Sequence, residues 1–224
     1  MQSKTDLEQA PKIKWAYTAL VVIVTWFALV LQFSVSIPAY LANGRSVGNT
    51  LVQLFSYYTI LSNLLMVVCL TVILIAPRSA WGRFFLKGTV LTSIALYITI
   101  VALIYNVALR NIWHMEGLFK LANELLHVIN PVLFIIYWFV FVPKAGLKYR
   151  DVLPWLWFPF IYFIYVLIRG AISGDYPYPF LNVTKSGYEQ VMFNAFVLLP
   201  VIWGLGALYV LIARRMNRSE KISA

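Results

Sequence analysis

Long apolar stretches separated by short polar segments run through the whole chain. Six of these stretches have, or nearly have, the roughly 17–25 mainly apolar residues that a helix needs to cross a bilayer. Their approximate limits are residues 15–37, 51–76, 88–109, 125–142, 152–172 and 190–213. The pattern therefore predicts six transmembrane helices. Their predicted ends are marked by Pro38, Pro77, Pro143 and Gly174. Local bends or openings are expected at prolines inside the stretches, which are Pro131, Pro154, Pro159 and Pro200.

The composition is that of a protein embedded in lipid. The 224 residues are 62% hydrophobic and only 12% charged, whereas soluble domains are about 45–50% apolar and about 25% charged. A soluble globule of this length has too little interior for so much apolar side chain. We therefore predict an all-α polytopic membrane protein, a six-helix bundle forming one integral membrane domain over residues 1–224. The single cysteine, Cys69, excludes an intrachain disulfide.

Basic residues indicate the orientation of the predicted bundle. The net charge is +10, and thirteen Lys and Arg residues fall in the tails and loops on one side of the membrane. They are Lys4, Lys12, Lys14, Arg78, Arg83, Lys87, Lys144, Lys148, Arg150, Arg214, Arg215, Arg218 and Lys221. The loops on the other side hold four, which are Arg45, Arg110, Lys120 and Lys185. Since cytoplasmic loops carry the excess of basic residues, we expect both termini in the cytoplasm. This distribution explains the positive charge without a nucleic-acid partner.

Polar residues inside the apolar stretches lie mostly toward the predicted outer face. His127 is the most informative, because an ionisable side chain within a membrane span is costly and marks a candidate functional site. Helical spacing predicts two shared faces, formed by Ser56, Thr59 and Asn63 and by Asn123, His127 and Asn130. Polar residues also lie near the outer ends of the last two stretches, among them Tyr162, Tyr165, Arg169 and Asn194. This bias toward one leaflet predicts a site on the outer side of the membrane.

Each of these residues also has a purely structural interpretation. A threonine in a membrane helix commonly bonds the carbonyl one turn back, and a histidine can join two helices. Arg169 could pair with Asp175 or extend to the interface. The sequence has no zinc-protease, lipase or phosphate-loop motif, and His114 has no metal-ligand spacing to His127. We expect no cofactor and no metal. The expected partners are a lipid substrate and membrane lipids, with no nucleic acid.

Three short segments carry a resemblance to a known family. They are Phe55-Ser56-Tyr57-Tyr58-Thr59, Leu126-His127 followed by Pro131, and Tyr178-Pro179-Phe180-Leu181. In order and placement they resemble the androgen-induced gene family of six-span membrane proteins, which has many bacterial members. With the number of spans and the loop lengths, the resemblance covers nearly the whole chain. Animal members are threonine hydrolases that split fatty acid esters of hydroxy fatty acids. The resemblance implies a lipid-ester hydrolase in a bacterial cytoplasmic membrane.

The resemblance also implies that Thr59 is the nucleophile and His127 its base. A neutral histidine can take a hydroxyl proton near neutral pH and so make the threonine reactive. Candidate groups for the oxyanion or the substrate are Asn63, Asn130, Arg169, Asn194 and Tyr165. Arg169 could instead hold the carboxylate of an acidic lipid. This chain lacks the acidic residue expected three positions after the threonine, and Asn63 and Asn130 are the candidates to replace it.

Two other classes of function remain open at the level of sequence. The polar cluster could bind or carry a small amphiphilic lipid without catalysis, or it could only join helices in a structural or regulatory membrane protein. No carboxylate is obviously placed to orient His127, and Glu124 and Asp175 are the only candidates. Covalent labelling of Thr59 by a fluorophosphonate would distinguish an enzyme from both alternatives.

Overall fold

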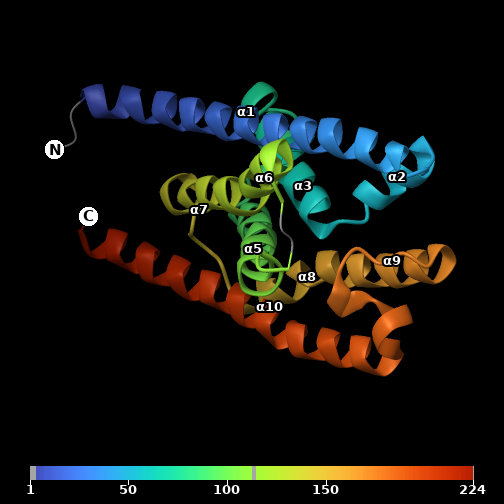
Figure 1. Ribbon diagram of the computed structural model, residues 1–224. Coiled ribbons are helices and arrows are strands. Elements are labelled where there is room, and N and C mark those ends of the chain that lie inside the picture. The colour runs from blue at the N-terminus through green and yellow to red at the C-terminus, as the bar shows by residue number, and fades with distance from the viewer. Residues whose placement is uncertain (1–3, 113–114, 224) are drawn as a thin grey trace. The chain divides into compact units, whose positions relative to one another are not determined.

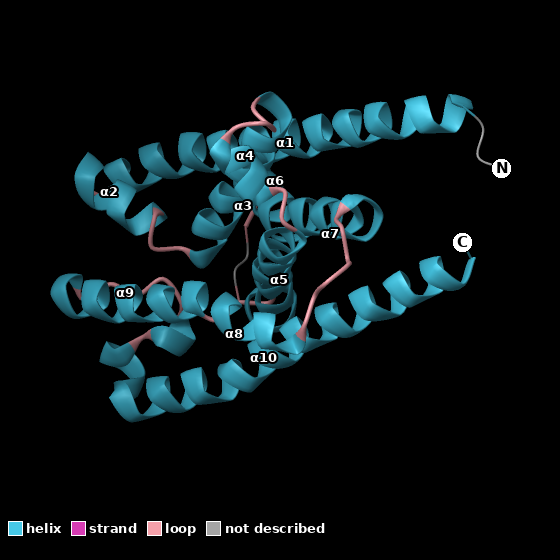
Figure 2. Ribbon diagram, turned by 180° about the vertical axis from the view of Figure 1, so that it is seen from behind, coloured by secondary structure: helices cyan, strands magenta, loops and turns pink. Residues whose placement is uncertain are grey.

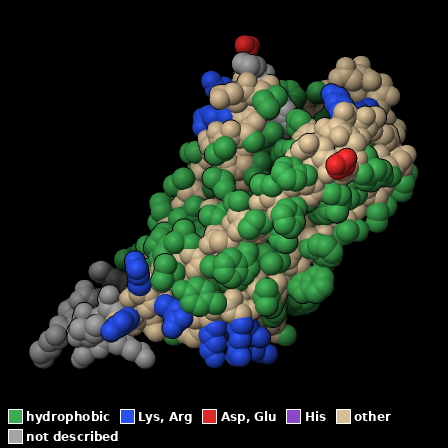
Figure 3. Space-filling view, turned by 90° about the horizontal axis from the view of Figure 1, so that it is seen from below, with side chains coloured by type: hydrophobic (Ala, Val, Ile, Leu, Met, Phe, Trp, Pro, Cys, Tyr) green, Lys and Arg blue, Asp and Glu red, His purple; other side chains and the backbone are tan. Residues whose placement is uncertain are grey.

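The computed structural model describes residues 4–112 and 115–223, and this part of the chain consists of helices and loops without strands (Figures 1 and 2). His114 lies outside the described residues. Six helical segments are long and apolar enough to cross a membrane, at Lys12–Ala42, Tyr58–Ile75, Gly88–Leu109, Gly117–Phe141, Tyr149–Ser173 and Val183–Arg218. Hydrophobic side chains are prominent on the surface (Figure 3). The chain is therefore an all-α polytopic membrane protein, as the apolar pattern predicts.

The fold divides into two compact units. The first comprises Met1–Ser46 and Thr59–Pro143. Its elements are α1 (Lys4–Ala42), α3 (Tyr58–Ile75, from Thr59 onward), α4 (Ala80–Phe85), α5 (Gly88–Ile104), the π-helix η1 (Tyr105–Leu109), α6 (Gly117–Glu124), the π-helix η2 (Leu125–Ile129) and α7 (Asn130–Phe141). Within this unit α5 packs on α7, and α1 packs along α6, η2 and α7. The third and fourth spans therefore each contain a π-helix, and in the fourth span it carries His127.

Large aromatic side chains and close backbone contacts hold the first unit together. Trp138 is fully buried in α7, and its indole Nε1 donates a hydrogen bond to Thr92 Oγ1 in α5 at 2.9 Å. Gly88 begins α5 against the chain that leaves α7, where an added Cβ would lie 2.3 Å from the Pro143 carbonyl oxygen. Only glycine fits at that contact. The packing fixes α5 against α7, next to the two π-helices.

The second unit comprises Val47–Tyr58 and Lys144–Ala224. Its elements are α2 (Val47–Leu54), the 3-10 turn η3 (Tyr149–Asp151), α8 (Val152–Trp155), α9 (Trp157–Ser173), the 3-10 turn η4 (Pro179–Leu181) and α10 (Val183–Ser223). α10 contacts α8 and η4, while the Tyr162 hydroxyl of α9 donates to the Ser56 carbonyl at 2.8 Å. The segment after α2 is thus attached to the fifth span.

Helix ends differ from the sequence prediction at several spans; the fourth begins at Gly117 rather than at residue 125. α1 continues past Pro38 and ends near Gly44, where the Gly44 and Arg45 amides donate back to the Leu41 and Tyr40 carbonyls. This is a glycine-terminated helix end, with Gly44 at a φ of 79°. The second span begins at Tyr58 rather than residue 51, because α2 is a separate helix. The sixth helical segment begins at Val183 and has a break at Gly187, with a φ of 76°.

The prolines inside the spans act in different ways. Pro131 is the second residue after η2, and the break at Leu156 between α8 and α9 falls between Pro154 and Pro159. A proline lacks the amide hydrogen that a helix needs, so local opening is expected at such positions. α10 continues through Pro200 as a helix. Gly174 ends α9 in the left-handed conformation, as the sequence predicts.

The orientation of the six spans leads to a direct test. We expect Ser46→Cys and Lys185→Cys to react with a membrane-impermeant maleimide added to intact bacterial cells, because the side carrying four basic residues faces outward. Lys148→Cys is the matched control and should react only after the cells are opened. The native Cys69 is fully buried, so background labelling should be low. If Lys148→Cys alone reacted in intact cells, the predicted orientation would be wrong and the two termini would lie outside.

Candidate active site

The hydroxyl of Thr59 and the imidazole of His127 are in direct contact in the first unit. Thr59 is the second residue of α3, and its Oγ1 lies 3.0 Å from His127 Nε2 in η2. Thr59 is 6% exposed and His127 is 7% exposed. They are 68 positions apart in the chain and are brought together by the packing of two spans. This is the geometry of a hydroxyl nucleophile and its general base.

The other ring nitrogen of His127 fixes the direction of this hydrogen bond. His127 Nδ1 lies 2.9 Å from the backbone carbonyl oxygen of Asn123. A carbonyl oxygen only accepts hydrogen bonds, so Nδ1 carries the proton of the neutral ring. Nε2 then offers its lone pair to the Thr59 hydroxyl. A backbone carbonyl therefore orients His127, rather than either carboxylate considered from the sequence.

Glu124 and Asp175 have other partners. Glu124 Oε1 accepts from Arg110 Nη2 at 2.8 Å and forms a salt bridge with it. Asp175 belongs to the second unit, where its backbone carbonyl accepts from Arg169 Nη1 at 2.6 Å. The group in contact with His127 Nδ1 is thus the Asn123 carbonyl, and not the Glu124 carboxylate that the sequence offered as a candidate. Glu124 pairs with Arg110 instead.

The π-helix η2 creates an unusual requirement beside His127. In a regular α-helix the Leu126 carbonyl would accept from the Asn130 amide, but that amide donates to Leu125. The next possible donor, five residues on, would be Pro131, which has no amide hydrogen. Leu126 therefore depends on a partner outside its helix. Asn63 Nδ2 supplies the hydrogen bond at 3.2 Å.

Asn63 connects both catalytic candidates. Its amide nitrogen donates to the Thr59 carbonyl at 2.9 Å as well as to the Leu126 carbonyl. Its Oδ1 accepts from Asn130 Nδ2 at 2.9 Å. Both amide hydrogens of Asn63 are used inside the protein, so none is left for an oxyanion. Asn63 is therefore a positioning residue, and Asn130 holds its amide in the required orientation.

Asn130 retains hydrogen-bonding capacity. The side chain is fully buried, and its Oδ1 has no hydrogen-bond partner among the described residues. One of its two amide hydrogens goes to Asn63. Buried amide groups are almost always fully paired. Asn130 is thus the asparagine of this pair that can contact a substrate.

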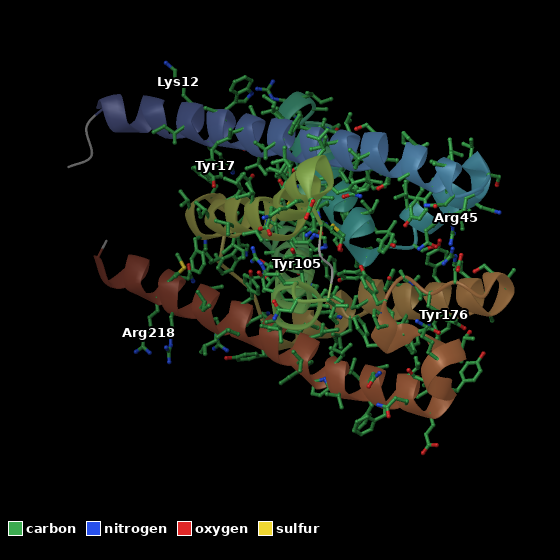
Figure 4. The ribbon with its side chains drawn as sticks, viewed as in Figure 1. Lys12, Tyr17, Arg45, Tyr105, Tyr176 and Arg218 are labelled. Atoms are coloured by element: carbon green, nitrogen blue, oxygen red, sulfur yellow. The ribbon has the colours of Figure 1, made fainter. Side chains whose placement is uncertain are left out.

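Tyr105 covers one face of His127, and the sequence pattern does not point to it. Its ring stacks on the imidazole with centroids 4.3 Å apart and planes inclined by 29°. Its hydroxyl accepts from Asn123 Nδ2 at 2.6 Å, so it also contacts the residue whose carbonyl orients the histidine. Tyr105 is the first residue of η1, and Figure 4 shows it among the packed helices of the first unit. The π-helix that it opens gives no sequence pattern of its own.

The remaining predicted site residues belong to the second unit. Tyr162, Tyr165 and Arg169 share one face of α9 and contact the segment of α2 and Ser56, as the helical spacing predicts. Ser56 Oγ donates to the Val52 carbonyl at 2.6 Å, and it lies 3.2 Å from the Tyr165 hydroxyl. Ser56 therefore does not continue the helical face of Thr59 and Asn63. The reason is that α2 ends before α3 begins.

Asn194 anchors the last loop. Its Nδ2 donates to the Phe180 carbonyl at 2.9 Å, and its Oδ1 accepts from Gln190 at 2.9 Å.

Among the described residues, no three His, Cys, Asp or Glu side chains gather in a way that could hold a metal ion. The chemistry available in the first unit is thus that of Thr59, His127 and their neighbours.

Comparison of the chain with known protein families, with curated proteins and with solved structures finds no match.

Loss of the Asn63 amide should weaken the region around His127. Asn63→Ala leaves the buried Leu126 carbonyl without a donor, which costs about 1–3 kcal/mol. We expect the free energy of unfolding in detergent to fall by about that amount. Asn106→Ala is the matched control, because Asn106 is an exposed asparagine of η1 that bonds a carbonyl of its own span. Equal stability of the two variants would contradict the role assigned to Asn63.

Proposed function

We propose that this protein is an intramembrane hydrolase of lipid esters with Thr59 as nucleophile and His127 as general base. The observation that carries the proposal is the 3.0 Å contact between the Thr59 hydroxyl and a histidine nitrogen that can only accept. The resemblance in three segments to the androgen-induced gene family supports the same two residues. Fatty acid esters of hydroxy fatty acids are the substrate class that this resemblance suggests.

The reaction proceeds through an acyl-enzyme. Thr59 Oγ1 attacks the ester carbonyl carbon while its proton passes to His127 Nε2, and a tetrahedral oxyanion forms. Collapse of this intermediate breaks the bond to the alcohol, which takes the proton from His127. Water then repeats the sequence at the Thr59 ester, with His127 as base and afterwards as acid. A carboxylic acid leaves, and the threonine is restored.

Two features would stabilise the charges that develop in this reaction. Thr59 stands at the N-terminus of α3, where the helix dipole favours negative charge, and Asn130 has a second amide hydrogen for an oxyanion. His127 becomes a cation when it takes the proton. The Tyr105 ring lies 4.3 Å from it, within the roughly 6 Å range of a cation–π interaction. Together they suit ester cleavage in an apolar site.

The setting in six apolar spans favours a lipid substrate. A hydroxyl and an imidazole buried within such spans meet molecules that dissolve in the bilayer more readily than soluble esters. A bacterial cytoplasmic membrane is the location that the resemblance suggests. A non-enzymatic binder or carrier of an amphiphilic lipid is the second candidate, since it would also need a polar cluster within the spans.

The catalytic pair is tested by its non-additive behaviour. Thr59→Ala and His127→Ala should each abolish hydrolysis of long-chain fatty esters, and the double variant should lose little more than either, because the two side chains act as one unit. Mass spectrometry should locate a fluorophosphonate adduct on Thr59 in the unmodified protein. The adduct should be absent from Thr59→Ala and strongly reduced in His127→Ala.

Thr99→Ala is the matched control for these variants. Thr99 is a threonine in α5 whose hydroxyl bonds the Ala95 carbonyl one turn back at 2.8 Å. Its removal should leave both the adduct and the activity unchanged. An unlabelled Thr59 in folded protein that still binds fatty esters would favour the carrier instead.

Tyr105 provides a second test of the mechanism. Tyr105→Leu removes the ring beside the imidazolium and should lower kcat about tenfold, which corresponds to the roughly 1–2 kcal/mol of a desolvated cation–π contact. Tyr105→Phe keeps the ring and should retain more activity than the leucine variant. Steady-state kinetics of both variants supply the comparison. If Tyr105→Leu lost less activity than Tyr105→Phe, Tyr105 would have no part in the mechanism.

A further inference from the structure

A second buried polar group lies in the second unit and takes no part in the threonine–histidine pair. Arg169 lies near the C-terminal end of α9, just before its last turn, and is only 8% exposed. α9 belongs to a candidate span, so its guanidinium lies at the end of an apolar helix. A charge in such a place needs partners that satisfy its hydrogen bonds and balance its charge.

The hydrogen bonds of Arg169 are mostly to neutral groups. Nη2 donates to Gln53 Oε1 at 2.6 Å, and Nη1 donates to the backbone carbonyl of Asp175 at 2.6 Å. The Asp175 carboxylate is 4.0 Å from Nη2, and its side chain is 43% exposed. Arg169 Nε is buried without a hydrogen-bond partner among the described residues. These two hydrogen bonds use two of the five N–H groups of the guanidinium, so Nε–H and the second hydrogen of each Nη remain, with only a distant opposing charge.

The surroundings hold this guanidinium in a fixed position. Gln53 is oriented at both ends, because its Nε2 donates to the Tyr57 hydroxyl at 3.4 Å. On the next residue of α9, a Cβ at Gly170 would lie 2.0 Å from the Tyr176 ring, so the loop after α9 packs directly on the helix (Figure 4). The guanidinium of Arg169 is held by α9, by Gln53 of α2 and by the loop after α9. It therefore needs little reordering to bind a ligand.

We propose that Arg169 binds the carboxylate head group of an amphiphile, with Nε and the adjacent Nη as its donors. A guanidinium presents two parallel N–H groups that match a carboxylate. Ile168 and Ile172 are largely exposed on the same helix, so a ligand with an acyl chain finds apolar contacts beside the arginine. The bound carboxylate then replaces Asp175 as the nearest counter-ion of Arg169. This proposal does not rest on the proposed hydrolysis.

Binding of oleate to the purified protein in neutral detergent tests the site. We expect saturable binding by titration calorimetry and a rise in the unfolding temperature, neither of which oleyl alcohol or acetate should give. Arg169→Gln should weaken oleate binding more than tenfold, and Arg169→Lys should weaken it less. Thr59→Ala should bind oleate like the unmodified protein, which separates this site from the catalytic proposal. Equal binding in Arg169→Gln would overturn the assignment.

Two further variants distinguish a ligand site from a purely structural arginine, because the two roles predict different changes in oleate affinity and in stability. Asp175→Asn removes the competing carboxylate and should tighten oleate binding. If Asp175 is instead the sole counter-ion, this variant should lose stability and gain no affinity. Gln53→Glu places a carboxylate on Arg169 from within the protein, so it should fold stably and lose oleate binding. Preference for dodecyl phosphate over oleate would replace the carboxylate assignment with a phosphate head group.

Discussion

Within a bilayer, a backbone carbonyl must find its hydrogen-bond donor inside the protein, and this constraint governs the fourth span. Pro131 and the π-helix before it deprive the Leu126 carbonyl of any donor from its own helix. Asn63 of the second span fills that position. The same amide holds the Thr59 carbonyl, so one side chain fixes Thr59 and the segment of His127 together. The hydrogen bond that the fourth span lacks within its own helix is thus made by the second span, and it joins the two.

The end of α6 orients His127. The Asn123 carbonyl accepts a hydrogen bond from Nδ1–H, and Nε2 then faces Thr59 as an acceptor. Many histidine bases use a carboxylate for this purpose, and a carboxylate would bring a second charge into the apolar site. A carbonyl fixes the tautomer without adding a charge. Tyr105 then covers the ring that must carry a transient positive charge.

The two units treat charge differently. In the first, Arg110 and Glu124 form a close pair, and the histidine network beside them is neutral at rest. In the second, Arg169 is buried among neutral acceptors, with its nearest opposing charge 4.0 Å away. A neutral network around the histidine is compatible with proton transfer. A buried cation without a close counter-ion favours the binding of an anion.

The sequence by itself determined the membrane-embedded helical class and the number of spans, because hydrophobic length is a local property. It also indicated His127, since ionisable groups in apolar helices are few, and the family resemblance added Thr59. The tertiary structure decided how they act. Helical spacing placed Ser56 with Thr59, yet the break before α3 assigns Ser56 to Tyr165. The π-helices, the Asn123 carbonyl and the double use of Asn63 depend on contacts between spans, and no residue pattern along one helix encodes such contacts.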